Sequence, residues 1–183
     1  SAAFPDGLAN SSGQVGRNLM FNGQTATYGE FDHPLNEYKR VQVTRIIHDF
    51  YESDPRRGFY GGGGIDARQT YGPLMFALFG LPPDEPQWGS LFKRRLREAY
   101  PRTMEVAGHT TSLPLESNTI TLDPEVKDRY GIPVLRFHWQ WTDHEILQVK
   151  HMQETFRELL THMGGQIFSS MPGREQGYGI ATG

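Results

Sequence analysis

The stretch VLRFHWQWTDHEILQVKHMQETFRELLTHMGGQIFSS (residues 134–170) places a strand pattern, a long helix pattern and a second strand pattern in direct succession. Apolar residues in 143–163 recur mostly at steps of three or four, which predicts a helix with one buried face. They are Ile146, Val149, Met152, Phe156, Leu159, Leu160 and Met163. Thr142 or Asp143 is placed to cap the helix start, and Gly164 with Gly165 to end it in a left-handed turn. Residues 166–170 predict a last strand.

Strand patterns precede this helix at residues 103–111, 118–122 and 132–141, which are rich in the β-branched and aromatic residues that strands favour. In the third, one face carries Leu135, Phe137, Trp139 and Trp141, and the other carries Arg136, His138 and Gln140. The joint at 123–131 predicts a helical turn or loop closed by Gly131. Regular patterns at 24–28 and 38–51 come earlier, the second of them strand-like. Together they predict an α+β domain with a mostly antiparallel sheet flanked by helices.

Glycine and proline mark the boundaries of segments in the middle of the chain. Four consecutive glycines, residues 61–64, predict a tight turn or a close backbone approach. A phosphate-binding loop is the weaker interpretation, because no Lys-Ser/Thr pair follows. The apolar stretch 73–83 predicts a short buried helix or a pocket wall. Residues 88–100 predict a helix with Ser90 as its N-cap and a solvated face at Lys93–Arg95.

Composition excludes several classes of protein. The chain has 183 residues, of which 37% are hydrophobic and 21% charged, and this fits one globular domain. Its net charge of -3 gives no basic surface for nucleic acid. No apolar run reaches the roughly 18 residues that a membrane-spanning helix needs. The absence of cysteine excludes disulfides, thiolate catalysis and zinc–thiolate sites, and it fits the cytoplasm and an export route equally.

Residue patterns alone single out little chemistry. His144 and His151 lie too far apart along the helix for a metal-chelating pair, so we expect two surface histidines and no metal site. No GxSxG elbow is present. Paired carboxylates for glycoside hydrolysis stay open, although no pair stands out because Asp32, Asp66, Asp123 and Asp143 each have a turn or cap explanation. His138 and Gln140 lie on the polar face of an aromatic strand and are candidate contacts for a sugar-like ligand, with a structural histidine as the alternative.

Two longer stretches resemble a known family when they are taken together. SSGQVGRNLMFN (residues 11–22) resembles the segment that glucose–methanol–choline (GMC) flavoprotein oxidoreductases carry after their flavin-binding half, which usually reads VGxNLxxH. LPLESNTITLDPEVKDRYGIPVLRFHWQWTDHE (residues 113–145) resembles the family block NxVTLDPxxKDxxGxPxxRxxxxxxxNE. GEFDHPLNEYKRVQV (residues 29–43) is similar to the gluconate-, sorbitol- and glucose-dehydrogenase-like bacterial branch.

The resemblance covers nearly the whole chain but only the middle of the family's protein. It implies that residues 1–23 link to a missing FAD-binding half, residues 24–172 form the substrate-binding domain, and residues 173–183 begin the return. The family's catalytic histidine and its partner are expected beyond Gly183, so the chain alone is predicted to be inactive. The implied reaction is CH–OH oxidation of a sugar, sugar acid or polyol by hydride transfer to FAD. Implied partners are the rest of the enzyme and an electron-transfer subunit.

Site residues follow position by position from the same resemblance. Val15, Gly16, Asn18 and Leu19 match the flavin-proximal segment, where a glycine lets backbone approach a flat ring. Asn22 departs from the usual His or Gln. His109, His138 and Gln140 become substrate candidates. The matches in the second block are interpreted as structural: Asn118, Asp123, Lys127, Asp128, Gly131 and Pro133. The alternatives are a stand-alone α+β module that binds a small ligand without redox activity, and a structural docking domain.

Overall fold

The computed structural model describes residues 4–5, 7–21, 23–41, 43–68, 72–82 and 84–171. A five-stranded sheet forms its centre, in the order β2-β3-β4-β1-β7, and every neighbouring pair is antiparallel. Its strands are β1 (Gln24–Glu30), β2 (Val43–Ile47), β3 (Ile65–Arg68), β4 (Thr103–His109) and β7 (Gln166–Met171). Helix and antiparallel sheet are thus combined, which confirms the α+β prediction.

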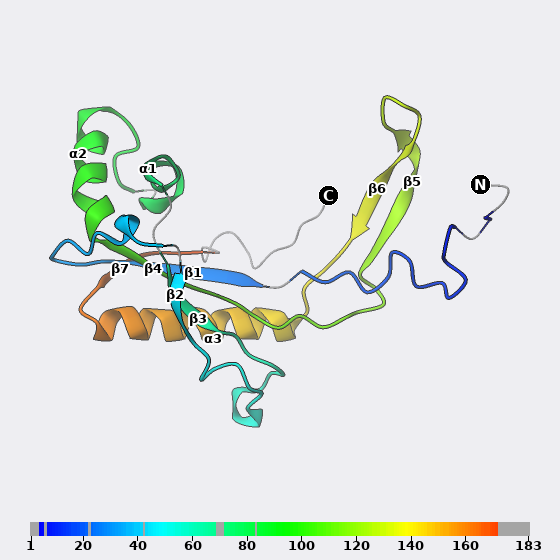
Figure 1. Ribbon diagram of the computed structural model, residues 1–183, viewed down its shortest axis with the longest axis horizontal. Coiled ribbons are helices and arrows are strands. Elements are labelled where there is room, and N and C mark those ends of the chain that lie inside the picture. The colour runs from blue at the N-terminus through cyan, green and yellow to red at the C-terminus, as the bar shows by residue number, and fades with distance from the viewer. Residues whose placement is uncertain are drawn as a thin grey trace.

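The long helix α3 (Asp143–His162) covers one face of this sheet (Figure 1). The two surfaces meet in one apolar core, in which Val106 of β4 and Met152, Phe156 and Leu160 of α3 are almost fully buried. Burial of a side chain of this size stabilises the fold by roughly 1.5–3 kcal/mol. The predicted helix is confirmed, since Thr142 and Glu145 form a capping box.

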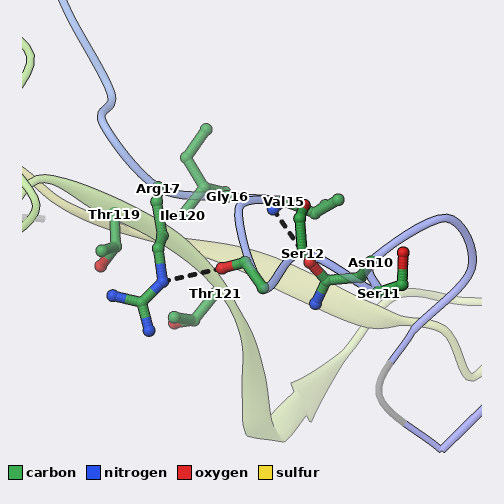
Figure 2. Close-up of a pocket in the computed structure, with 10 residues that line it drawn as sticks. Asn10, Ser11, Ser12, Val15, Gly16, Arg17, Thr119, Ile120 and Thr121 are labelled. Carbon is green, nitrogen blue, oxygen red and sulfur yellow. Dashed lines mark hydrogen bonds between the residues drawn. The ribbon is translucent and has the colours of Figure 1, made fainter.

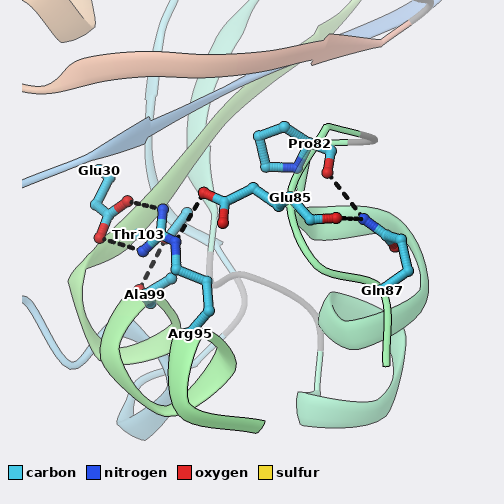
Figure 3. Close-up of polar contacts among 7 residues, drawn as sticks. All are labelled: Glu30, Pro82, Glu85, Gln87, Arg95, Ala99 and Thr103. Carbon is cyan, nitrogen blue, oxygen red and sulfur yellow. Dashed lines mark hydrogen bonds and ion pairs between the residues drawn. The ribbon is translucent and has the colours of Figure 1, made fainter. Parts of the chain in front are cut away.

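Three shorter helical segments lie between β3 and β4: α1 (Pro73–Met75), a turn of π-helix at Phe76–Gly80 and α2 (Gly89–Ala99). Figure 1 shows α1 and α2 on the side of the sheet away from α3. Arg95 of α2 joins this layer to the sheet, because its guanidinium pairs with Glu30 of β1 at 2.5 Å and with Glu85 at 2.8 Å (Figure 3). The chain also has short 3₁₀ turns at Glu37–Lys39, Pro55–Arg57 and Tyr100–Arg102.

Three predictions for this layer need correction. The N-cap of α2 is Trp88, not Ser90, and Trp88 makes no side-chain cap. The apolar stretch predicted as buried is mixed: Phe76 and Leu81 pack against Ala99, whereas Leu74 is 72% exposed. Pro83 lies outside the described residues. The KRR triplet does not form a wholly solvated face either, since Arg95 holds the ion pairs just described.

Strands β5 (Thr119–Lys127) and β6 (Pro133–His138) form a separate two-stranded hairpin that projects away from the sheet (Figure 1). The turn predicted at 123–131 is wrong for 123–127, which belong to β5. Asp123 explains the misassignment: its Oδ1 accepts the backbone N–H of Glu125 and Val126 at 2.9 and 2.8 Å, as in a turn, but within an irregular part of the strand. The reversal comes at Asp128–Gly131.

Strand β6 also ends earlier than predicted, at His138 and not at residue 141. There Asn118 takes over the pairing: its Oδ1 accepts the Gln140 N–H at 3.1 Å, and its Nδ2 donates to the Gln140 carbonyl at 3.2 Å. Asn118 and Asp123 therefore have the structural roles that the sequence indicated. In the described part of the chain, no helix combines the length and apolar character needed to cross a bilayer.

Candidate functional site

A pocket of about 430 Å³ lies at the edge of the sheet where β2 and β4 end and β3 begins. It is lined by Ile46, His48, Tyr51, Gly62, Gly64, Asp66, His109, Thr110 and Thr111. His109, a predicted substrate contact, is therefore placed with a second imidazole, a phenol and a carboxylate. This His109 pocket combines an aromatic wall with convergent polar groups, the usual make-up of a small-molecule site.

Gly62 and Gly64 line the His109 pocket, and Gly61 has the left-handed φ of +77°. Residues 61–64 form no turn of their own, so the predicted tight turn is not found. The Gly63 N–H donates to the Phe50 carbonyl at 3.1 Å, and the Thr111 N–H donates to the Gly62 carbonyl at 3.1 Å. A Cβ on Gly62 would lie 1.9 Å from the Phe50 oxygen, and one on Gly63 would lie 2.4 Å from the His109 oxygen. The glycines are needed because backbone passes on both sides, which agrees with the close approach predicted from the sequence.

An Asp–Arg pair stands at the edge of the His109 pocket. Asp66 and Arg68 are two apart on β3, so both side chains lie on one face of the sheet. The Arg68 guanidinium pairs with the carboxylate through Nε at 2.5 Å and Nη2 at 2.9 Å, and both side chains are nearly buried at 13% and 11% exposure. Arg68 Nη2 also lies 3.3 Å from His109 Nε2. A guanidinium only donates, so in a hydrogen bond at this contact His109 Nε2 is the acceptor.

Beside this pair lies Glu105 of β4, opposite Arg68 in the register of β3 and β4, and it is 1% exposed. Burial raises the pKa of its carboxyl to about 7, against the lowering effects of the Arg68 charge and of a hydrogen bond from Tyr28, while Asp66 adds to the rise. Glu105 pairs with Tyr28 on β1 and with Arg68 on β3, so all three share the sheet face opposite α3. That face therefore contains a buried polar cluster beside the pocket.

Sequence reasoning missed Asp66, Arg68 and Glu105. The turn or cap explanation for Asp66 is wrong, because this residue lies within a strand. The sequence does contain a signal: Asp-x-Arg directly after a glycine run puts two opposite charges on one strand face. His48 and Tyr51 carried no comparable signal, since only the fold brings residues 46–51 beside β4.

A second pocket, of about 660 Å³, lies between the N-terminal loop and β5 (Figure 2). The loop contributes Asn10, Ser11, Ser12, Gly13, Val15, Gly16 and Arg17, and β5 contributes Thr119, Ile120 and Thr121. Asn10 Oδ1 accepts the Val15 N–H at 3.0 Å, and Arg17 Nε donates to the Gly13 carbonyl at 2.8 Å. These hydrogen bonds within residues 10–17 hold the loop in one conformation. We call this the loop pocket.

The predicted flavin-proximal residues lie in or beside the loop pocket, docked on β5. The Ile120 N–H donates to the Gly16 carbonyl at 2.7 Å, and the Leu19 N–H donates to the Asn118 carbonyl at 2.9 Å. Gly16 has φ +79°, and a Cβ there would lie 2.2 Å from the Ile120 oxygen. The close approach that this glycine permits is therefore to β5. Asn18 also has positive φ, and its amide donates to Gln14 at 3.3 Å.

The remaining predicted substrate contacts do not join His109. His138 lies across the hairpin from Thr119, which lines the loop pocket, and Gln140 follows β6 in the segment held by Asn118. His138 and His109 thus belong to different sheets. Asn22 and residues 172–183 lie outside the described residues.

His144 and His151 are not the surface histidines that we expected. Both are half-buried under the segment 50–60: the His144 Nδ1 accepts the Tyr60 N–H at 3.3 Å, and the His151 ring lies 5.4 Å from that of Phe59. Their Nε2 atoms are buried without a hydrogen-bond partner among the described residues. Burial, and then the Arg57 charge, lower the pKa of His151, which Glu158 opposes. Within the described ranges no three His, Cys, Asp or Glu side chains gather as a metal site would require.

Two curated proteins are similar to this chain. A 2-methyl-1,2-propanediol dehydrogenase from Mycolicibacterium austroafricanum is 30% identical over 154 residues, which is 78% of this chain and 26% of that protein. A gluconate 2-dehydrogenase flavoprotein from Pantoea cypripedii is 26% identical over 164 residues, which is 86% of this chain and 26% of that protein. No family model matches the chain. The chain thus spans about a quarter of the length of the curated relatives it matches. Both relatives are dehydrogenases, and this supports the interpretation that the parent protein is an oxidoreductase.

Proposed function

We propose that this chain forms the substrate-binding portion of an FAD-dependent oxidoreductase of the GMC family. The enzyme oxidises a CH–OH group of a sugar, sugar acid or polyol by hydride transfer to flavin. The observation that carries the proposal is the similarity to two dehydrogenases over 78% and 86% of the chain, one of them named a flavoprotein. The two motif blocks at residues 11–22 and 113–145 support the same family.

The His109 pocket is the proposed place for the alcohol. The lining presents an imidazole, a phenol hydroxyl and a carboxylate, from His48, Tyr51 and Asp66. These groups suit a ligand that is rich in hydroxyl groups. Arg68 Nη2 lies 3.3 Å from His109 Nε2, and this contact positions the His109 ring to hydrogen-bond a hydroxyl of the ligand. His138 and Gln140 remain candidate contacts from the hairpin side.

Val15, Gly16, Asn18 and Leu19 are proposed to border the flavin. The chain fits such a group in one respect: Val15, Met20 and Phe21 expose 63%, 52% and 46% of their side chains along this segment, an apolar surface for a flat ring to cover. Flavin, when bound, supplies the hydride acceptor. The rest of the enzyme binds the dinucleotide part of FAD and supplies the catalytic histidine pair. An electron-transfer subunit is a further proposed partner.

The test uses the full reading frame from which this chain comes. We expect the purified full-length protein to show flavin absorbance and to reduce an artificial electron-accepting dye with a polyol or sugar acid, while the 183-residue chain alone does neither. A full-length protein without flavin, or without dye reduction on any alcohol, contradicts the proposed function. Dye reduction by the chain alone contradicts the proposed division of the site.

A further inference from the structure

We propose that the His109 pocket takes a neutral vicinal diol, held by the Asp66 carboxylate, and discriminates against a carboxylated sugar. This inference rests on the proposed function, and it narrows the substrate class of the same site. It starts from the way in which Asp66 and Arg68 neutralise each other at the pocket wall.

The charge of the pocket favours a neutral ligand. None of the described residues that line it is a lysine or arginine, and Asp66 is its carboxylate. Arg68, the nearby cation, does not line the pocket, and its guanidinium pairs with that carboxylate through Nε and Nη2 at 2.5 and 2.9 Å. A ligand carboxylate in the pocket would therefore lie against a carboxylate of the lining, and two like charges at close range repel each other.

Asp66 retains acceptor capacity for two adjacent hydroxyl groups. An ionised carboxylate has about four lone-pair positions. Each Asp66 oxygen accepts one hydrogen bond from Arg68, which leaves roughly one position on each oxygen. The hydroxyls of a vicinal diol lie close enough to donate to both oxygens of one carboxylate, which a single alcohol does not offer. Ile46 and Tyr51, at 52% and 63% exposure, provide an apolar wall for the carbon chain.

The first experiment uses the unmodified full-length enzyme with matched substrates. We expect kcat/KM for propane-1,2-diol to exceed that for propan-1-ol and propane-1,3-diol by about ten-fold or more, because one charge-assisted hydrogen bond is lost. A neutral hexitol should likewise exceed the corresponding sugar acid. Equal or faster oxidation of the sugar acid or of the single alcohol overturns the diol assignment. Absence of activity on every alcohol instead contradicts the proposed function itself.

The second experiment changes the proposed residue. Asp66→Asn should lower kcat/KM for propane-1,2-diol by about ten- to a hundred-fold while that for propan-1-ol changes much less. Asp54→Asn is the matched control, because Asp54 also holds an arginine two residues later, through Arg56 Nε and Nη2, but lies outside the pocket. It should leave both substrates unaffected. An equal loss on both substrates in a folded Asp66→Asn protein refutes the role of Asp66, and the first experiment decides when that variant does not fold.

Discussion

Glu105 offers a direct test of the polar cluster on the sheet face opposite α3. Its side chain is 1% exposed, and burial raises the pKa of its carboxyl to about 7 from an ordinary value of 4.5. Between those two pH values the unfolded chain has released the proton while the folded chain still holds it. Stability is therefore fully present below about pH 4.5 and is lost as the pH rises toward 7.

The size of the loss follows from the two pKa values. At 1.36 kcal/mol for each pKa unit, the difference between 4.5 and about 7 amounts to about 3 kcal/mol. Glu105→Gln removes the ionisable group and keeps an oxygen that accepts from Tyr28. The variant should match the wild type near pH 4.5 and exceed its free energy of unfolding by up to about 3 kcal/mol at pH 8.

Urea unfolding followed by tryptophan fluorescence at pH 5, 6, 7 and 8 measures this difference. Glu154→Gln is the matched control, because Glu154 is an exposed glutamate on α3 and its substitution should leave the pH dependence unchanged. A carboxyl NMR titration gives an independent reading, with the Glu105 midpoint expected near pH 7. The reasoning is refuted when the wild type and Glu105→Gln show parallel stability curves over this range.

Two further predictions concern the segment around the glycine run. Folding lowers the pKa of His151, so this group lowers stability as the pH falls below about 6.5; His151→Phe should flatten the acid side of the urea-unfolding profile, and an unchanged profile contradicts the burial of this ring. Gly62→Ala should cost about 2–3 kcal/mol in unfolding free energy, because its Cβ would lie 1.9 Å from the Phe50 carbonyl oxygen. Gly72→Ala is the control, with open space around the added carbon; equal effects of the two substitutions would falsify the close approach.

Local patterns predicted α3 and several strands but not β3, and they did not indicate which strands pair. The 143–163 periodicity and its caps predict α3 because a helix is closed by local contacts. The pairing of β1 with β7 joins Thr27 to Ser170, and no local pattern reports so distant a partner. Asp123 shows the other kind of error: a side chain that bonds its own backbone resembles a turn even within a strand.

The candidate site was predictable only at positions marked by a motif or by the family resemblance. His109 came from the family resemblance, and the glycine run indicated a close backbone approach. The sequence did not mark Asp66 or Glu105 as site residues. Both are buried, and their burial depends on neighbouring strands that only the fold brings together. Gly16 shows how two explanations of one residue compete, since β5 already occupies the space that its missing side chain leaves.

The cluster also sets how the charge of the sheet face changes with pH. Below about pH 7 the buried Glu105 holds its proton, so Asp66 and Arg68 leave this face with no net charge among the three. Above that pH, ionised Glu105 adds one negative charge behind Arg68, and it weakens the attraction that the guanidinium has for any anion. We therefore expect a sugar acid in the His109 pocket to lose affinity by this effect as the pH rises through about 7, whereas a neutral diol that hydrogen-bonds to Asp66 should not. The pH dependence of the ratio of the two kcat/KM values thus connects the titration of Glu105 to the substrate preference assigned to Asp66.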